Sequence, residues 1–216
     1  MSIRPDREYR TVYLPDMQFR AVEQEDDTEK SYVVEGYATT YDDPYVLYER
    51  DGIEVKESIS RDALVGADMN DVIFLYNHEG MVFARQSNGT LELSSDDKGL
   101  HVRADLGSTE DSRRMFESIK AGLVTQMSWA FTIKAGGIDY DGDAHLSTIR
   151  SVKKVYDVSA VSIPANPNTG ISEQTRRSLD GVIEVEIEKR RSERERAEQI
   201  ERIRKNLKGV SGDGNQ

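Results

Sequence analysis

Short runs of apolar, β-branched and aromatic residues recur along residues 31–172, with turn residues between them. Some runs alternate polar and apolar side chains and others are continuously apolar, as expected of strands buried on one face or on both. Strands are expected at residues 32–38, 45–55, 72–76, 81–84, 91–93, 100–106, 124–133, 148–155 and 158–163. Many short strands of this kind predict a mainly β fold, either a small barrel or a sandwich.

One helix is well marked among these strands, so the fold class is α+β. Ser108 or Thr109 can cap its start, and Lys120 and Gly122 are residues that favour a helix end. A shorter helical turn is expected at residues 60–64.

The ends of the chain differ in composition from its middle. Residues 1–30 mix charged and scattered apolar side chains and are interpreted as an arm and a linker. Two prolines, Pro164 and Pro167, should stop the last strand, which ends the folded domain of residues 31–172 near Ile171.

Residues 173–216 are expected to form a charged helical tail. Ile200, Ile203 and Leu207 recur at helical spacing and give this helix a narrow apolar stripe. A helix docked on its own domain and a partner-binding segment fit this pattern equally well. Within the tail, residues 182–188 alternate apolar residues with glutamate, which is also compatible with a strand.

Composition restricts the classes of function. A chain of 216 residues that is 37% hydrophobic can bury one core. Its formal charge of -11 repels phosphate backbones, so protein partners are favoured over nucleic acid. The chain has no cysteine, which excludes disulfides and thiolate chemistry, and it shows no apolar run of signal-peptide or membrane-spanning type. We therefore expect a soluble intracellular protein that is not bound to a membrane.

A histidine, a serine and a carboxylate each interrupt or end an apolar run, where a polar side chain is costly unless it is paired or used. These are His78, Ser128 and Asp157. A serine hydroxyl becomes a nucleophile when an imidazole takes its proton and a third group orients that imidazole. The three residues together predict a serine hydrolase, although each taken alone is compatible with a structural role.

The other candidates for this chemistry are weaker. His101 alternates with Arg103 and Asp105 on a face expected to contact water, and His145 follows a loop rich in glycine and aspartate. Asp157 could instead form an ion pair with a nearby lysine or arginine. The acidic loop at residues 139–143 lacks the spacing of a calcium site, so no metal and no cofactor are assigned.

Several segments, taken in order, resemble the prohead proteases of tailed double-stranded DNA phages, which are related to herpesvirus assemblins. The similarity covers about residues 31–172. The segments that carry it are Val34–Ala38, Tyr76-Asn77-His78, Gly99–Val102, Lys120-Ala121-Gly122, Met127–Phe131 and Asp157–Pro167.

The resemblance implies that Ser128 is the nucleophile and His78 the general base and acid. A carboxylate matching Asp157 is implied as the third member, with His145 as its competitor because assemblins use a second histidine. The chain departs from the family at Trp129 and Ala130, where smaller residues are usual, and this departure predicts a changed substrate groove or oxyanion site.

The resemblance also implies a closed or partly closed assemblin-like β-barrel flanked by helices. It implies a serine endopeptidase that cleaves the scaffolding part of the major capsid protein, and also itself, during procapsid maturation. Such an enzyme would self-associate and act inside the immature capsid in the host cytoplasm. The rival from another class is a non-enzymatic capsid assembly or scaffold-binding module, and an esterase using the same residues is a further alternative.

Overall fold

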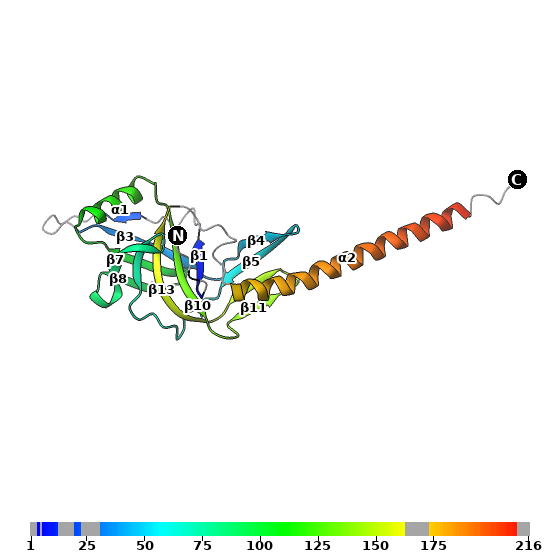
Figure 1. Cartoon of the computed structure of the whole chain (residues 1–216), viewed down its shortest axis with the longest axis horizontal. Coiled ribbons are helices and arrows are strands. Elements are labelled where there is room, and N and C mark those ends of the chain that lie inside the picture. Colours follow the sequence, from blue (N-terminus) through cyan, green and yellow to red (C-terminus); the bar gives the residue numbers. More distant parts are fainter. Residues whose placement is uncertain (1–3, 5, 13–19, 23–30, 163–172, 211–216) are drawn as a thin grey trace. The chain divides into compact units, whose positions relative to one another are not determined.

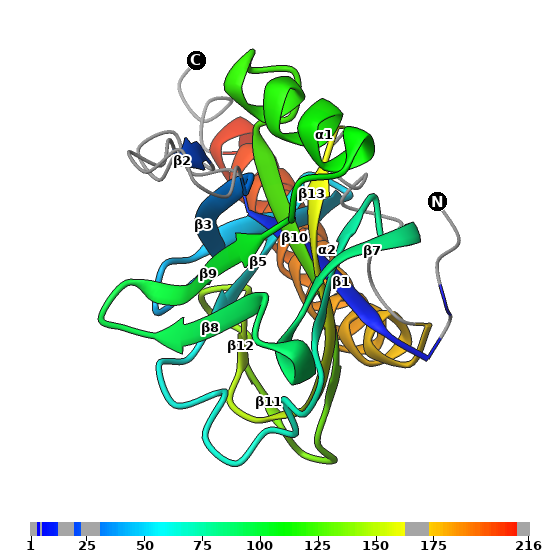
Figure 2. The ribbon, with the colours of Figure 1, turned by 90° about the vertical axis from the view of Figure 1, so that its left-hand side faces the viewer.

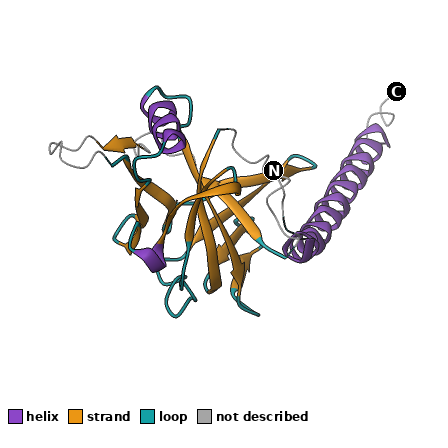
Figure 3. Ribbon diagram, turned by 60° about the vertical axis from the view of Figure 1, so that its left-hand side comes forward, coloured by secondary structure: helices purple, strands orange, loops and turns teal. Residues whose placement is uncertain are grey.

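The computed structural model describes residues 4, 6–12, 20–22, 31–162 and 173–210. The expected stop at Pro164 and Pro167 and the domain end near Ile171 lie outside these residues. The chain divides into two compact units, Met1–Glu173 and Gln174–Gln216. Most of the regular structure described in the first unit is β-strand, and the fold is mixed α+β (Figures 1 and 3).

The strands of the described residues form three sheets. The five-stranded sheet has the order β1 (Glu8–Val12), β10 (Gln126–Ile133), β13 (Val152–Val161), β6 (Ile73–Tyr76) and β7 (Glu79–Arg85). The second sheet has the order β11 (Ile138–Asp141), β12 (Leu146–Ile149), β5 (Ile53–Ile59) and β4 (Tyr45–Arg50). The third has the order β2 (Arg20–Val22), β3 (Val33–Thr40), β9 (Gly99–Asp105) and β8 (Leu91–Ser95). These sheets are not closed into a barrel, so the predicted barrel is not confirmed.

The expected helix is confirmed as α1 (Glu110–Lys120). Thr109 caps its start, since the side chain of Thr109 accepts a hydrogen bond from the backbone amide of Ser112. Met115, Phe116 and Ile119 are buried along one side of the helix, where they join the main hydrophobic core. A short 3-10 helix, η1 (Gln86–Asn88), follows β7.

Some predicted boundaries of strands and of the short helical turn were wrong. Residues 45–55 form two strands, β4 and β5, with left-handed Asp51 and Gly52 between them, a hairpin that the Asp-Gly pair indicates. The predicted break near Asp157 does not exist, because β13 runs through it without interruption. Residues 61–66 form consecutive turns in place of the expected helical turn.

The N-terminal segment also differs from the expected arm. Strand β1 pairs antiparallel with β10 (Figure 2). Tyr9 and Arg10 are 3% and 2% exposed, so β1 belongs to the sheet and to its buried interior. The mixed polarity of this strand conceals its burial, because its charged side chains are paired inside the protein.

The main core lies between the sheets and one side of α1. Trp129, Phe74 and Phe131 are fully buried, and Trp129 stacks on Phe131 with ring centroids 3.9 Å apart. Trp129 belongs to this core cluster, and Ala130 is also buried. Packing this dense fixes the backbone of β10, which is the strand that carries Ser128.

The second unit consists of α2, which begins at Glu173, before the unit boundary, and ends at Val210. Residues 182–188 are helical, so the strand alternative is wrong. Ion pairs spaced by four residues, such as Arg194 with Glu198, line the helix, and Ile200 and Ile203 are exposed. In the part of the chain that the structure describes, neither α1 nor α2 is long and apolar enough to cross a bilayer.

Candidate active site

His78 lies in the tight turn that joins β6 to β7. Tyr76 pairs with Glu79, which leaves Asn77 and His78 as the two central residues of the turn. Both are left-handed, with φ angles of 52° and 60°, the combination that a type I′ hairpin requires. Histidine is one of the residues that tolerate this conformation, and the turn holds its ring at the end of a rigid hairpin.

Asp157 lies on β13, the strand next to this hairpin in the sheet, and Ser128 lies on β10, one strand further away. In the pairing of β10 with β13, Ser128 is opposite Ser159, and Ala130 is opposite Asp157. Strand β13 also pairs in parallel with β6, which continues into the turn of His78. The sheet therefore brings together three side chains that are far apart in the sequence.

These three side chains are in hydrogen-bonding contact. His78 Nε2 lies 2.7 Å from Ser128 Oγ, and His78 Nδ1 lies 2.5 Å from Asp157 Oδ1. Ser128 is fully buried, and the side chains of His78 and Asp157 are 1% and 5% exposed. With the Nδ1 proton directed to Asp157, Nε2 is left as the acceptor for the serine proton.

Two further side chains hold the imidazole in place. Ser159 Oγ donates to Asp157 Oδ1 over 2.9 Å and lies 3.2 Å from His78 Nδ1. The ring of Tyr9 meets the imidazole edge-on, with centroids 4.9 Å apart. This arrangement orients the imidazole as a base toward the serine hydroxyl. Acyl transfer by a serine needs a base held in this way.

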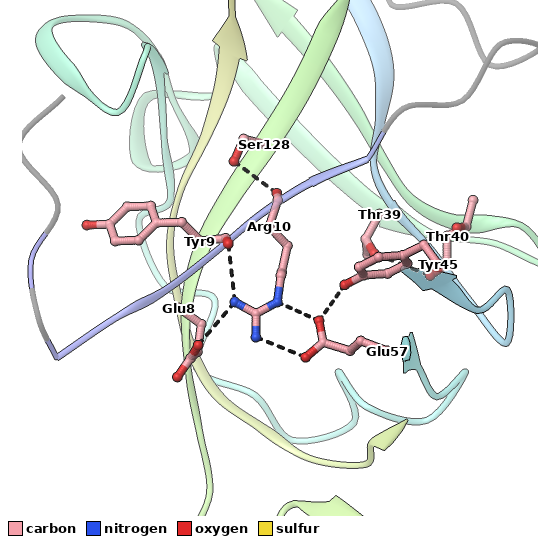
Figure 4. A network of polar contacts seen from close by, with 8 residues as sticks. All are labelled: Glu8, Tyr9, Arg10, Thr39, Thr40, Tyr45, Glu57 and Ser128. Atoms are coloured by element: carbon pink, nitrogen blue, oxygen red, sulfur yellow. Dashed lines mark hydrogen bonds and ion pairs between the residues drawn. The ribbon is translucent and has the colours of Figure 1, made fainter. Parts of the chain in front are cut away.

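The hydroxyl of Ser128 makes a second contact, with β1. Ser128 Oγ donates to the backbone carbonyl oxygen of Arg10 over 2.9 Å (Figure 4). A serine hydroxyl has one proton, so the Arg10 carbonyl competes with His78 for it. Ser128 therefore makes both a contact with a backbone carbonyl, as a structural serine can, and a contact with an imidazole, as a nucleophile needs.

The side chain of Arg10 is held by a buried carboxylate. Arg10 Nε and one terminal nitrogen lie 2.5 Å and 2.9 Å from the two oxygens of Glu57, which is fully buried. Glu8 lies 3.1 Å from the other terminal nitrogen, and the hydroxyl of Tyr45 donates to Glu57 (Figure 4). This bidentate pairing is the strongest geometry available to an arginine and a carboxylate.

The ionisation of this cluster follows from its burial and its charges. Burial alone lowers the pKa of Arg10, but Glu57 and Glu8 outweigh it and raise that pKa above its ordinary value. Burial, and then the charge of Glu57, raises the pKa of Tyr45 well above its ordinary value. Tyr45 therefore stays a hydrogen-bond donor to Glu57 at neutral pH.

The competing candidates lie elsewhere. His101 is in β9 of the third sheet, with its ring beside Tyr37, and His145 is in the loop between β11 and β12 of the second sheet. Two of the nearby basic residues that could have paired with Asp157 are paired with other carboxylates. Lys154 pairs with Asp68, and Arg150 pairs with Asp139.

Sequence reasoning missed the supporting residues. Ser159 could have been found, because it follows Asp157 by two positions and alternation places both on one face of a strand. Tyr9, Arg10 and Glu57 gave no such signal, because their contacts join segments that are distant in the sequence. Trp129 is one of the two residues at which the chain departs from the family. It packs in the core, so any effect that it has on the substrate groove or oxyanion site is indirect.

The comparisons with known proteins agree with the chemistry of this site. Residues 17–182 match the family model described as caudovirus prohead serine protease. Searches of curated proteins and of solved structures gave no match.

A matched segment that spans most of the chain identifies a serine peptidase. The chain belongs to the caudovirus prohead serine protease family. Membership gives it a role in the maturation of phage capsids and an interaction with capsid proteins.

Proposed function

We propose that Ser128 is the nucleophile of this peptidase and that His78 is its general base and acid. The observation that carries the proposal is the 2.7 Å contact between His78 Nε2 and Ser128 Oγ. Ser128 Oγ attacks the scissile carbonyl while Nε2 takes its proton, and Nε2 then returns the proton to the leaving amine. Water hydrolyses the acyl-enzyme by the same route in reverse.

Asp157 acts through His78 in this proposal. Its carboxylate, 2.5 Å from Nδ1, fixes the tautomer of the ring and stabilises the imidazolium that forms during attack. Ser159 holds Asp157 in that position through its 2.9 Å hydrogen bond. Asp157 is preferred to His145 as the third member because it is the group next to Nδ1.

The proposed substrates are the scaffolding part of the major capsid protein and the protease itself, cleaved inside the immature capsid in the host cytoplasm. The test is incubation of purified full-length chain with unprocessed capsid protein, followed by intact mass spectrometry. We expect discrete fragments from the scaffolding part with wild-type chain and none with Ser128→Ala. Equal fragmentation by both chains would remove Ser128 from the mechanism, and an untouched capsid protein would exclude the proposed substrate.

The charged part of α2 is proposed to recruit the protease into the procapsid. Leu179 and Ile183 are buried, whereas the residues described beyond Ile183 are mostly exposed and charged. A chain that ends at Ile183 should therefore keep peptide cleavage but fail to enter procapsids, as measured by immunoblotting of purified particles. Incorporation at the wild-type level would contradict this role.

Self-association and the assemblin-like barrel belong to the same proposal and rest on the family resemblance. Sedimentation of the full-length chain across a range of concentrations tests the first of these. A monomer at all concentrations would contradict it.

A further inference from the structure

Strand β1 covers the proposed nucleophile. It is the edge strand of the five-stranded sheet and pairs with β10 so that Thr11 lies opposite Ser128 and Arg10 opposite Trp129. Without β1, β10 would itself be the edge strand, with its backbone groups free to pair with another extended segment. The family match begins at residue 17, so the segment that fills this edge lies outside the matched region.

The contacts of β1 are those that an extended peptide substrate would need. The carbonyl that meets Ser128 Oγ, at 2.9 Å, is that of Arg10, whose side chain is bound by Glu57 on a different sheet. Backbone pairing with β10 fixes the register of the segment. Glu57 binds the side chain of the residue whose carbonyl group faces Ser128.

We propose that β1 occupies the position of the substrate strand, and that Glu57 and Tyr45 select an arginine as the residue whose carbonyl meets Ser128. This proposal rests on Ser128 being the nucleophile. The edge of β10 together with Glu57 and Tyr45 is called the β1 seat below. Its ligand is an extended peptide with a basic residue, supplied either by β1 or by a substrate.

Burial makes the β1 seat selective. Glu57 is fully buried, so a peptide with a neutral residue at the Arg10 position would leave a buried carboxylate without its cation. An acidic residue would add repulsion between like charges. Tyr45 can donate one hydrogen bond to Glu57, whereas the guanidinium contacts both carboxylate oxygens, so the hydroxyl does not replace the arginine.

The same contacts make β1 inhibitory. Ser128 is fully buried while β1 is in place, and its hydroxyl proton is donated to the Arg10 carbonyl oxygen, which competes with the transfer to His78 that attack requires. A substrate strand and β1 cannot pair with the same edge of β10 at once. Weakening the Arg10–Glu57 pair should therefore admit other peptides to the β1 seat.

Binding of a labelled peptide with the sequence of residues 6–12 tests the β1 seat without turnover. The host is the full-length chain with Ser128→Ala, which prevents cleavage, and Arg10→Gln, which weakens β1. Fluorescence polarisation should show that the peptide with arginine at the Arg10 position binds at least about 30-fold more tightly than the same peptide with glutamine at that position. Adding Glu57→Gln to the host should reduce this ratio to about threefold or less.

The matched control replaces Arg10→Gln by Arg20→Gln, which breaks an exposed ion pair with Glu35 between β2 and β3. In this control β1 stays in place and the labelled peptide should bind at least about tenfold more weakly than in the Arg10→Gln host. Equal binding of the two peptides, or a preference for arginine that survives Glu57→Gln, would overturn the proposal.

A second measurement uses cleavage by the wild-type chain and so does not depend on whether a variant folds. Peptides with one scissile bond preceded by arginine or glutamine should differ in kcat/KM by at least about 30-fold. Arginine-selective binding without cleavage of either peptide by the wild-type or the Arg10→Gln chain would support the β1 seat but refute Ser128 as nucleophile. Cleavage that requires Ser128 but shows no preference would refute the β1 seat alone.

Discussion

Replacing Ser128 by alanine is expected to lower peptide cleavage by about 10^4 to 10^6 in kcat. The substitution removes the oxygen that lies 2.7 Å from the imidazole, so no acyl-enzyme can form. It should also stop any time-dependent shortening of the purified chain. Both effects are measured on one preparation, with a quenched peptide for turnover and intact mass for self-cleavage.

Ser147 provides the matched control for this substitution. It is a fully buried strand serine in the second sheet, and its hydroxyl has no hydrogen-bond partner among the residues that the structure describes. Ser147→Ala should therefore leave both turnover and self-cleavage close to the wild-type rates. Similar losses in the two variants would show that the effect of Ser128→Ala comes from packing and not from chemistry.

Replacing Asp157 by asparagine is expected to lower kcat by about 10^4 with little change in shape. Asparagine keeps the size of the side chain, but its amide group cannot stabilise the imidazolium and favours the wrong ring tautomer. KM should change far less than kcat, because Asp157 contacts His78 and Ser159, not the proposed substrate strand. Steady-state kinetics on a single peptide separates the two constants.

Asp68→Asn serves as the control for the loss of a carboxylate. Asp68 pairs with Lys154, which lies on β13 as Asp157 does, but this pair is near the protein surface. An exposed ion pair contributes little to stability because solvent screens it, so this variant should retain its activity. If His145→Ala reduces kcat as strongly as Asp157→Asn, the assignment of the third member is contradicted.

Sequence reasoning selected the three polar candidates because each interrupts or ends an apolar run, where a polar side chain is costly without a partner. It also placed α1 correctly, since caps and first-turn acids are local signals. The expected strand at residues 72–76 ends just before His78, but the sequence did not reveal a two-residue turn at Asn77 and His78. The observed φ angles place the turn at those two residues.

The N-terminal strand could not be predicted in this way. Charged residues in β1 indicate solvent contact when they are read alone, and burial of Arg10 depends on Glu57, which lies in another sheet. Partnership between distant charges leaves no periodic pattern in the sequence. The contact between Ser128 and the Arg10 carbonyl depends in the same way on the pairing of two distant strands, so the sequence gives no sign of it.

Strand β1 links the fold of this chain to its chemistry. The contacts that stabilise β1 in the sheet are also those that bury Ser128, so the stability of β1 and access to the nucleophile oppose each other. Arg10→Gln is therefore expected to expose the serine by weakening a structural ion pair.

The most direct measurement of the central claim is the position of a covalent adduct formed by an organophosphonate. The reagent is added to wild-type chain and to Arg10→Gln, residual peptidase activity is followed, and the adduct is mapped by tandem mass spectrometry. A nucleophilic Ser128 predicts that activity is lost in step with modification of Ser128, faster in Arg10→Gln, and that His78→Ala suppresses the modification. Loss of activity with the adduct on a different serine would contradict it.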